Sequence, residues 1–335
     1  MAESPHHESL RAAYKGARVA IAGGLGFIGS NLAARLAGLG AEVLIVDALL
    51  PGQGGNRFNV AEIGDRVAIE IADLRRADAA SLVTGRHYLF NLAGQPGHQA
   101  SMEEPIDDLE LNCGVTLRLL EACRRFAPRI AVVFASTRQV YGRPDYLPVD
   151  EKHSLAPVDV NGINKLAAES YHRLYGQIYG LRSSVLRLTN TYGPRMRIKD
   201  ARQTFIGIWL RDLLENRPFE VWGGAQLRDF TYVDDAVEAL LLAAVNPAAL
   251  GQVFNLGGER AVTLTDLAAL AVAANGGGSF TTRNFPPERK RIDIGDFHAD
   301  DKLFRAATGW APRVTLAEGL ARTLDYFRAN LAAYL

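Results

Sequence analysis

The chain has 335 residues, of which 48% are hydrophobic and 22% charged, a composition typical of a packed globular protein of one or two domains. Lysine plus arginine and aspartate plus glutamate each total 37, so the formal net charge is zero. Because proteins that bind nucleic acid usually carry a basic excess, nucleic acid is not an expected partner. No apolar run reaches the ~18 residues of a membrane span, so we expect no membrane partner either.

The N-terminal segment and the two cysteines bear on cellular location. Residues 1–16 contain no apolar signal core, so we expect a short disordered tail and a cytoplasmic protein. Cys113 and Cys123 lie in one stretch of helical spacing, too far apart to form a disulfide. We expect both to be buried thiols of a protein in a reducing compartment.

Apolar runs and helical stretches alternate from residue 17 to about residue 190. Short apolar runs, expected to be strands, lie at residues 17–22, 42–46, 67–71, 88–92, 130–135 and 184–188. Helical spacing is found between them, over 30–39, 77–83, 107–126 and 160–179. This alternation predicts an α/β fold, a Rossmann-like doubly wound parallel sheet covered on both faces. The alternation then breaks, which predicts a smaller C-terminal lobe interleaved with the sheet.

The first strand leads into the glycine-rich turn GGLGFIG, with Gly23, Gly26 and Gly29 at the spacing of a dinucleotide-binding turn. Such glycines allow a tight bend, a close approach of pyrophosphate and packing of the helix on the strand. The helix that follows offers free N–H groups to the phosphates, although a helix cap without a ligand is the alternative. Asp47, at the end of the second strand, is placed to accept hydrogen bonds from ribose hydroxyls and to repel a 2′-phosphate, so NAD is favoured over NADP.

Further motifs follow in a fixed order. They are Asp73-Leu74, Asn91-Leu92-Ala93, Ser136-Thr137, Val140-Tyr141-Gly142, Lys165, LTNTYGP over 188–194, RDFTYVDD over 228–235 and Gly309-Trp310. With these motifs the chain resembles the extended short-chain dehydrogenase/reductase superfamily over about residues 17–325, and more narrowly its NAD-dependent nucleotide-sugar epimerases and dehydratases. The motifs are specific for the superfamily, not for one substrate.

The resemblance implies NAD as the cofactor and assigns residues to it. It assigns Asp73 and Leu74 to the adenine, Asn91 and Ala93 to the nicotinamide side, and Lys165 to the nicotinamide ribose. The residues assigned to the pyrophosphate and the adenosine ribose are Gly23, Gly26, Phe27, Ile28, Gly29 and Asp47. The domains then follow: an NAD-binding domain over 17–190, with a later contribution from about 228–256, and a nucleotide-sugar-binding lobe over 191–227 and 257–335.

The resemblance also implies a nucleotide-sugar substrate and a homodimer. Thr137 would bind the sugar C4 hydroxyl, and Asn190 and Arg228 would hold the diphosphate. Lys290 or Arg291 are further candidates for the same group. Guanidinium donors match phosphate oxygens, whereas a surface salt bridge with the adjacent aspartate is the alternative for the arginine. The dimer would form through the apolar stripes of the helices at 107–126 and 160–179.

The resemblance breaks at the residue that does acid/base work in the family. There a tyrosine four residues before the lysine takes the sugar's hydroxyl proton, and this spacing puts both side chains on one helix face. Here the residue four before Lys165 is Asn161. An amide has no useful pKa, so Asn161 occupies the catalytic position without its chemistry.

Two further departures follow Thr137. The family's dehydratases carry an Asp-Glu pair there, and its decarboxylases a glutamate at the second position, whereas this chain has Arg138 and Gln139. Neither offers a carboxylate, so epimerisation is favoured over dehydration and decarboxylation. Arg138 is a candidate clamp for a substrate carboxylate such as a uronate, and a solvated arginine is the alternative.

A substitute base is sought among Tyr141, His98, His153, Asp159 and Tyr192. His98 follows the fourth strand, where the family's substrate cleft lies, and imidazole titrates in the useful range. A loop histidine that is merely exposed or packed is the alternative. No residues have the spacing of metal ligands, and no metal is expected.

These patterns predict an NAD-dependent nucleotide-sugar epimerase that acts on a nucleoside-diphosphate hexose or uronate without net redox change. One alternative is a nucleotide-sugar-binding protein that kept the cofactor fold and lost turnover at Asn161. Another is an unusual dehydratase or reductase with a relocated base.

Overall fold

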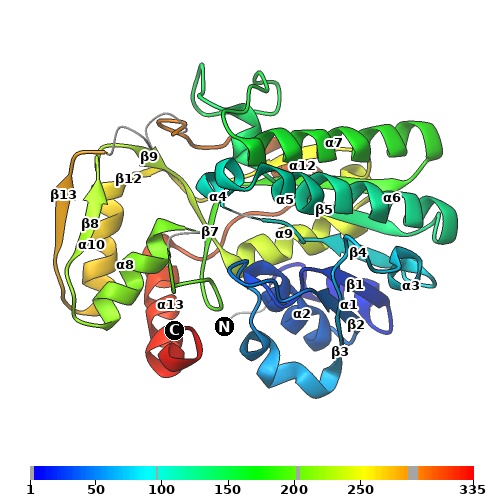
Figure 1. The fold of residues 1–335 in the computed structure, drawn as a ribbon, viewed down its shortest axis with the longest axis horizontal. Helices are drawn as coiled ribbons and strands as arrows, with labels where there is room; N and C mark the ends of the chain where they lie inside the picture. Colours follow the sequence, from blue (N-terminus) through cyan, green and yellow to red (C-terminus); the bar gives the residue numbers. More distant parts are fainter. Residues whose placement is uncertain (1–3, 96, 201–203, 286–292) are drawn as a thin grey trace.

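The computed structural model describes residues 4–95, 97–200, 204–285 and 293–335 (Figure 1). Its central element is a seven-stranded sheet with the order β11-β6-β5-β4-β1-β2-β3, in which all neighbouring strands are parallel. The strands are β1 (Arg18–Ala22), β2 (Glu42–Asp47), β3 (Val67–Ile71), β4 (Tyr88–Asn91), β5 (Ala131–Thr137), β6 (Arg182–Leu188) and β11 (Val253–Leu256). The predicted Rossmann-like α/β class is confirmed.

Helices cover both faces of this sheet, because alternate residues of its strands are apolar on both sides. Val19 and Ile21 of β1 belong to the core shared with α2 (Phe27–Gly38) and α9 (Val233–Val245). Ala20 and Ala22 belong to a second core, under α3 and α6. The helices of that second face are α3 (Ala79–Val83), α6 (Val115–Phe126) and α7 (Val160–Tyr179).

In the described residues, the second lobe contains two-stranded sheets and three longer helices, and Figure 1 draws β8, β13, α8 and α10 on its left. Its helices are α8 (Phe205–Leu214), α10 (Leu264–Asn275) and α13 (Leu316–Asn330). Its paired strands are β7 (Asn190–Tyr192) with β10 (Phe230–Tyr232), β8 (Phe219–Trp222) with β13 (Phe280–Arg283), and β9 (Leu227–Arg228) with β12 (Val262–Thr263). The ring of Phe219 stacks between those of Trp209 and Phe280, which ties α8 to the β8–β13 pair.

The described residues also contain shorter elements. They are α4 (His98–Glu103), α5 (Pro105–Asp108), α12 (Lys302–Thr308), and the turns η1 (Arg57–Arg66), η2 (Leu109–Gly114), η3 (Arg138–Tyr141), η4 (Pro247–Ala249) and η5 (Leu331–Ala333). The stretch 107–126, expected to be one helix, is therefore α5, the π-helical turn η2 and α6 in succession. A π-helical turn inserts an extra residue per turn and turns side chains in a way that helical spacing does not reveal.

The expected disordered tail over residues 1–16 is wrong for residues 7–14, which form α1 (His7–Tyr14). Leu10 and Tyr14, one helical turn apart, are both 0% exposed. The Tyr14 hydroxyl donates a hydrogen bond to the carbonyl oxygen of Leu241 in α9, at 2.9 Å. Packing on α9 thus stabilises a helix that is too short to be stable alone.

Both cysteines are buried free thiols, as expected. Burial raises the pKa of the Cys123 thiol to about 12, so this residue is an unreactive core group. Among the residues described, no helix is long and apolar enough to cross a membrane.

The packing of α1 predicts a specific loss of stability. Leu10→Ala removes a fully buried side chain, so we expect the free energy of unfolding to fall by ~2–4 kcal/mol in urea denaturation. Glu8→Ala changes an exposed residue of the same helix and serves as the matched control. Equal unfolding midpoints for the two variants would show that α1 does not pack on the domain in solution.

Candidate active site

The glycine-rich turn connects β1 to α2 and leaves the start of α2 without a cap. α2 has no side-chain hydrogen bond at its N-cap residue, Gly26, and no acidic residue in its first turn. Phe27 is buried and Ile28 half-buried, so their side chains belong to the core and only their backbone N–H groups can serve a phosphate. This is the arrangement that the predicted pyrophosphate site requires.

Gly26 and Gly29 lie in the same turn, but packing within the protein requires glycine at only one of the two positions. A Cβ on Gly29 would lie 2.3 Å from the carbonyl oxygen of Gly23, so this glycine allows the helix to pack on the turn. A Cβ on Gly26 would approach only that oxygen, at 3.4 Å, and φ is −75° there. Packing against the described residues therefore does not require glycine at position 26. The close approach of a ligand would require it.

Asp47 joins the end of β2 to the glycine turn. Its Oδ2 accepts a hydrogen bond from the backbone N–H of Leu25, at 3.0 Å, and its Oδ1 accepts one from Leu49, at 2.9 Å. Burial raises the pKa of the carboxyl, and the two backbone hydrogen bonds oppose that rise. Asp47 thus holds the turn in place, and its contact with a ribose stays a prediction.

Asp73 and Leu74, assigned to the adenine, lie just after β3. The Asp73 carboxylate accepts hydrogen bonds from the Nε and Nη2 of Arg75, at 3.0 and 2.7 Å to Oδ2, and these bonds lower its pKa. Leu74 is buried in the core under α3 and α6. The ion pair fixes the direction of the loop beside the expected adenine position.

Asn91 ends β4, Ala93 follows two residues later, and Lys165 reaches from α7 to the last residues of β5. The Nδ2 of Asn91 donates to the Thr116 hydroxyl at 3.0 Å, while its buried Oδ1 has no hydrogen-bond partner among the described residues. Ala93 packs at the edge of the core under α6. The Nζ of Lys165 donates to the carbonyl oxygen of Ala135 at 3.0 Å and lies 4.7 Å from the centroid of the Phe134 ring. Burial lowers the pKa of Lys165 to about 8.

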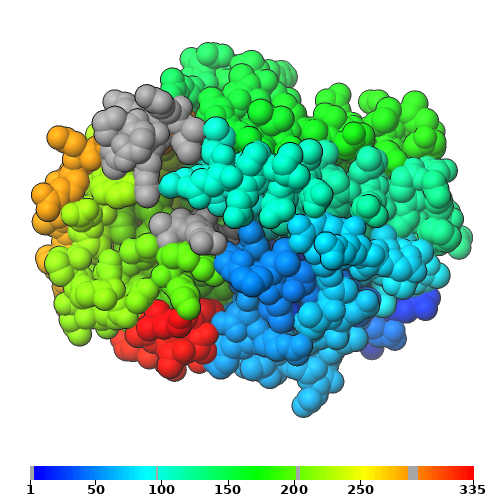
Figure 2. Space-filling model, in the orientation of Figure 1, coloured from blue at the N-terminus to red at the C-terminus, as the bar shows by residue number. Residues whose placement is uncertain are grey.

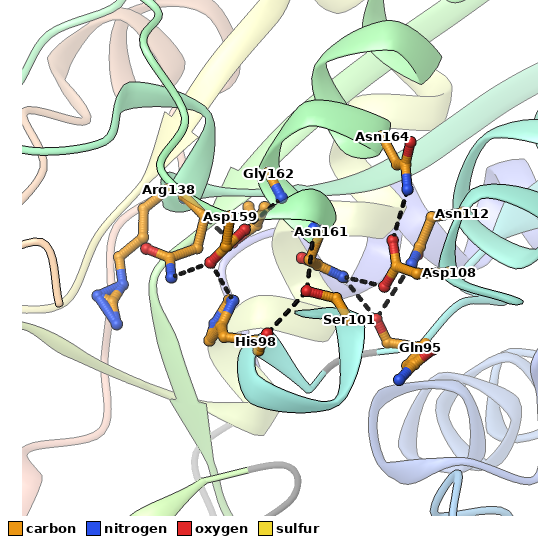
Figure 3. Close-up of polar contacts among 12 residues, drawn as sticks. Gln95, His98, Ser101, Asp108, Asn112, Arg138, Asp159, Asn161, Gly162 and Asn164 are labelled. Carbon is orange, nitrogen blue, oxygen red and sulfur yellow. Dashed lines mark hydrogen bonds and ion pairs between the residues drawn. The ribbon is translucent and has the colours of Figure 1, made fainter. Parts of the chain in front are cut away.

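Asn161 is a buried structural amide in this structure (Figure 3). Its Nδ2 donates to the carbonyl oxygen of Gln95 at 2.7 Å and to Asp108 Oδ2 at 3.2 Å. Its backbone N–H donates to the Ser101 hydroxyl at 3.2 Å. Asn164 donates to the other oxygen of Asp108 at 2.8 Å. Both N–H bonds of the Asn161 amide are therefore used, and its place in the catalytic set stays a prediction.

His98 lies beside a second buried carboxylate (Figure 3). Its Nδ1 is 3.1 Å from Asp159 Oδ2, and the exposed fractions of the two side chains are 36% and 0%. Asp159 is also the N-cap of α7: its Oδ1 accepts a hydrogen bond from the N–H of Gly162 at 2.6 Å. Gln139 Nε2 donates to Asp159 Oδ2 at 3.1 Å, and the N–H of Gln139 donates to the Thr137 hydroxyl at 3.3 Å. A chain of contacts thus joins His98 to the residue assigned to the sugar hydroxyl.

Arg138, Asn190 and Arg228, assigned to the substrate, gather at the boundary with the second lobe. Arg138 Nη2 donates to Asn190 Oδ1 at 3.1 Å, while its buried Nη1 has no hydrogen-bond partner among the described residues. Burial, and secondarily the positive charge of Arg228, lowers the pKa of Arg138 to about 10. Lys290 and Arg291 lie outside the described residues.

Arg228 does not form the surface salt bridge with the adjacent aspartate. It is buried, and its Nη2 donates to Asp293 Oδ1 at 3.0 Å. Its Nη1 donates to the carbonyl oxygen of Leu227 at 2.9 Å and to that of Gly295. Arg228 therefore also ties β9 to the segment after residue 292.

The other candidates for a substitute base are held in the protein interior. The Tyr141 hydroxyl donates to Asn255 Oδ1 at 2.7 Å, and burial raises its pKa to about 12. Burial also raises the pKa of Tyr192, whose hydroxyl donates to a backbone carbonyl at 3.3 Å. The side chain of His153 is 0% exposed, and its Nε2 accepts a hydrogen bond from the N–H of Asp145 at 2.9 Å. None of these three presents a free basic atom.

Sequence reasoning missed the partners of the site residues. Asp108, Gln95 and Ser101 hold Asn161, and Asp293 holds Arg228, but none of them was singled out. Asp108 and Asn112 lie four residues apart on one side of a helical stretch that also carries Asp107 and Glu110, so nothing in the sequence singled them out. Asp293 follows a basic segment and gives no signal either.

Comparison with known proteins places this geometry in a family. Residues 19–257 match the model of the NAD dependent epimerase/dehydratase family. UDP-glucose 4-epimerase of Mycolicibacterium smegmatis is 33% identical over 314 residues, 93% of this chain and 98% of the relative. UDP-glucuronic acid decarboxylase 1 of Xenopus tropicalis is 30% identical over 325 residues, 94% of this chain and 73% of the relative.

A solved structure is also similar over nearly its whole length. UDP-glucuronic acid 4-epimerase of Bacillus cereus, in complex with UDP-glucuronic acid and NAD, has a TM-score of 0.83 and 25% identity, with 93% of this chain and 99% of that one covered. The chain belongs to the NAD-dependent epimerase/dehydratase family, within the extended short-chain dehydrogenases, and its cofactor is NAD.

The residues present fit this cofactor. The uncapped start of α2 offers N–H donors to a pyrophosphate, and position 26 leaves room for one to approach. The buried Asn91 Oδ1, which has no partner among the described residues, is an acceptor at the end of β4 that suits an amide donor of a ligand. In doubly wound folds the ligand crevice lies beyond the carboxyl ends of the strands, where these groups are found.

Replacing Gly26 with alanine should affect NAD binding, whereas replacing Gly29 should affect stability. Gly26→Ala adds a methyl group where the protein has space, so we expect the unfolding midpoint to stay nearly unchanged while the affinity for NAD falls at least ~10-fold in calorimetry. Gly29→Ala places its Cβ against backbone, so we expect a loss of ~1–3 kcal/mol in stability. An unchanged NAD affinity in Gly26→Ala would remove the pyrophosphate from this turn.

Proposed function

We propose that this protein is an NAD-dependent nucleotide-sugar epimerase whose substrate is a nucleoside-diphosphate hexose or uronate. The observation that carries this proposal is the guanidinium of Arg138. It lies near Arg228, another buried cation, and one of its buried nitrogens has no partner among the described residues. Arg228 is paired with Asp293, and the charges of Asp229, Asp293 and Asp159 also act on Arg138. The free Nη1 of Arg138 is nevertheless a buried donor without an acceptor among the described residues, and an oxygen of a diphosphate or of a uronate carboxylate suits it.

Within this proposal the described residues divide the substrate between them. Arg228 and Asn190 hold the diphosphate, with Lys290 or Arg291 as further donors. Arg138 clamps the far end of the sugar, including a carboxylate where the substrate is a uronate, and Thr137 binds the hydroxyl at the reacting carbon. Lys165 holds the nicotinamide ribose and places a positive charge beside the sugar. NAD, when bound, supplies a reversible acceptor for a hydride.

Epimerisation accounts for the residues after Thr137 better than elimination or decarboxylation does. Gln139 is buried, and its amide is hydrogen-bonded to Asp159, so neither it nor Arg138 offers a carboxylate to the sugar. A general acid or base of the usual lyase kind is therefore missing at this position. This supports an isomerase rather than a lyase, although relatives include both.

One observation favours a second candidate function. Asn161 is locked in a buried network, which also suits a protein that binds NAD and a nucleotide sugar without turnover. Product analysis separates the two functions.

The experiment supplies a panel of nucleotide hexoses and uronates to the purified protein. We expect an epimeric product, no net change in the absorbance of the nicotinamide after turnover, and retention of a deuterium label placed on the epimerised carbon. Denaturation followed by mass spectrometry should release NAD. A nucleotide sugar that binds tightly, without any product from the whole panel, would favour the binding protein.

A homodimer and a cytoplasmic location belong to the same proposal. Apolar side chains are exposed along α5, η2 and α7, which lie side by side: Ile106, Leu109, Ile163, Leu174 and Ile178. Exposed apolar side chains on neighbouring helices are typical of a protein interface.

The dimer predicts a mass of two chains in light scattering at micromolar concentration. Ile178→Asp places a charge in the apolar surface, so we expect it to halve the measured mass. Leu303→Asp, on α12, changes another exposed apolar residue and should leave the mass unchanged. A one-chain mass for the unmodified protein would remove this interface.

A further inference from the structure

The proposed reaction needs a group that takes the hydroxyl proton of the sugar and returns it. Asn161 cannot do so, because an amide does not titrate and both of its N–H bonds are used. Tyr141, Tyr192 and His153 are engaged in the interior, as described above. His98 differs from them, because its side chain is 36% exposed while its Nδ1 faces a carboxylate.

The contacts of Asp159 fix the orientation of that carboxylate. Gly162 donates to its Oδ1 at 2.6 Å, and Gln139 donates to its Oδ2 at 3.1 Å. With the side chain 0% exposed, water does not compete for these oxygens. The Nδ1 of His98 lies 3.1 Å from Asp159 Oδ2 without a hydrogen bond between them, and the negative charge of the carboxylate favours the imidazole tautomer with the proton on Nδ1. The Nε2 atom then carries the lone pair.

The Nε2 of His98 is available to a ligand in the structure as described. No hydrogen bond joins either ring nitrogen to a residue in the described ranges, and Nδ1 faces the carboxylate of Asp159. His98 begins α4, directly after the loop that follows β4, and Figures 1 and 2 place α4 beside the second lobe. Asp159 begins α7, which carries Lys165 six residues further on, and Gln139 links it to Thr137. Contacts through Asp159 and Gln139 thus join the imidazole to Thr137, the residue assigned to the sugar hydroxyl.

We propose that His98 is the acid/base residue of this enzyme and that Asp159 is its positioning residue. This inference rests on the proposed function. In the forward step the sugar's O–H bond breaks and its proton forms an N–H bond at Nε2. NAD, held by the residues assigned to it, would accept the hydrogen of the same carbon together with its electron pair, and that carbon would become a ketone. In the return step the hydride would come back from the cofactor to the opposite face of the carbon, and Nε2 gives its proton back to the oxygen.

Asp159 acts on the histidine and not on the substrate. It orients the ring and stabilises the imidazolium that forms when Nε2 takes the proton. The arrangement is that of a histidine base held by a buried carboxylate, which recurs on unrelated folds. In this protein the carboxylate is Asp159, which caps the start of α7. In the family, the corresponding helix carries the catalytic tyrosine.

The test compares His98→Gln with the unmodified protein and with His87→Gln, which changes an exposed histidine beside the start of β1. Glutamine keeps a polar side chain but cannot take a proton. For His98→Gln we expect turnover to fall ~10²- to 10⁴-fold, with NAD content and nucleotide-sugar affinity unchanged. For His87→Gln we expect no change. Full turnover in His98→Gln would overturn the assignment, whereas no product from the unmodified protein would overturn the proposed function and this inference together.

The role of Asp159 has a readout that does not depend on turnover. In the unmodified protein, nitrogen NMR of labelled histidines should find His98 as the Nδ1–H tautomer, assigned by the signal missing from His98→Gln. Asp159→Asn keeps a residue that caps a helix well, so α7 should fold. We expect this variant to lose the preference for that tautomer and to lower kcat more than it raises KM. A tautomer preference that persists in Asp159→Asn would remove Asp159 from this role.

Discussion

Seven strands that run in one direction end at one edge of the sheet, and the whole site depends on this constraint. The glycine turn follows β1, Asp47 ends β2, Asn91 ends β4 and Thr137 ends β5. These residues are far apart in sequence, yet parallel pairing with both faces covered leaves them no other place to meet. The second lobe supplies the remaining groups from above that edge, since Arg228 ends β9 and Asn190 begins β7.

Buried charged side chains also gather at this edge of the sheet, and neighbouring polar groups compensate their charges. Asp108 is 0% exposed and receives two amide hydrogen bonds, from Asn161 and Asn164. Its negative charge also acts on Lys165 and opposes the fall in pKa that burial causes there. An unpaired buried charge costs several kcal/mol, so these groups hold one another in place. Asp159, equally buried, is balanced by Gly162, Gln139 and His98.

Local patterns predicted the fold well where the chain carries its own boundary signals. α7 spans residues 160–179 as expected, because Asp159 caps its start and Gly180 ends it with a φ of +68°. The glycine turn and the buried strands were also recognisable from short windows of sequence. The helix over 7–14 was missed because its stability comes from α9, more than two hundred residues away. The π-helical turn was missed because apolar spacing does not report which backbone hydrogen bond is made.

The site could be predicted as a set of residues but not as a set of contacts. His98 and Asp159 were each named as candidates, while their pairing across 61 residues depends on how α4 meets the start of α7. For the same reason a surface partner was considered for Arg228, whose actual partner, Asp293, comes from a loop 65 residues further on. Side chains that meet through non-local contacts leave no periodic signal in the sequence.

The replacement of tyrosine by Asn161 involves more than one residue. Asn161 donates to Gln95 and Asp108, and Asn164, one turn along the same helix, donates to the other oxygen of Asp108. A phenol has a single O–H donor, so a tyrosine at position 161 could donate to only one of these two acceptors, although Asn112 also donates to the Gln95 carbonyl oxygen at 3.2 Å. The amide, the carboxylate and the second amide therefore form one self-consistent set. Once that set occupies the catalytic position, a proton acceptor has to come from another element, and the histidine at the start of α4 already faces the carboxylate that caps the same helix.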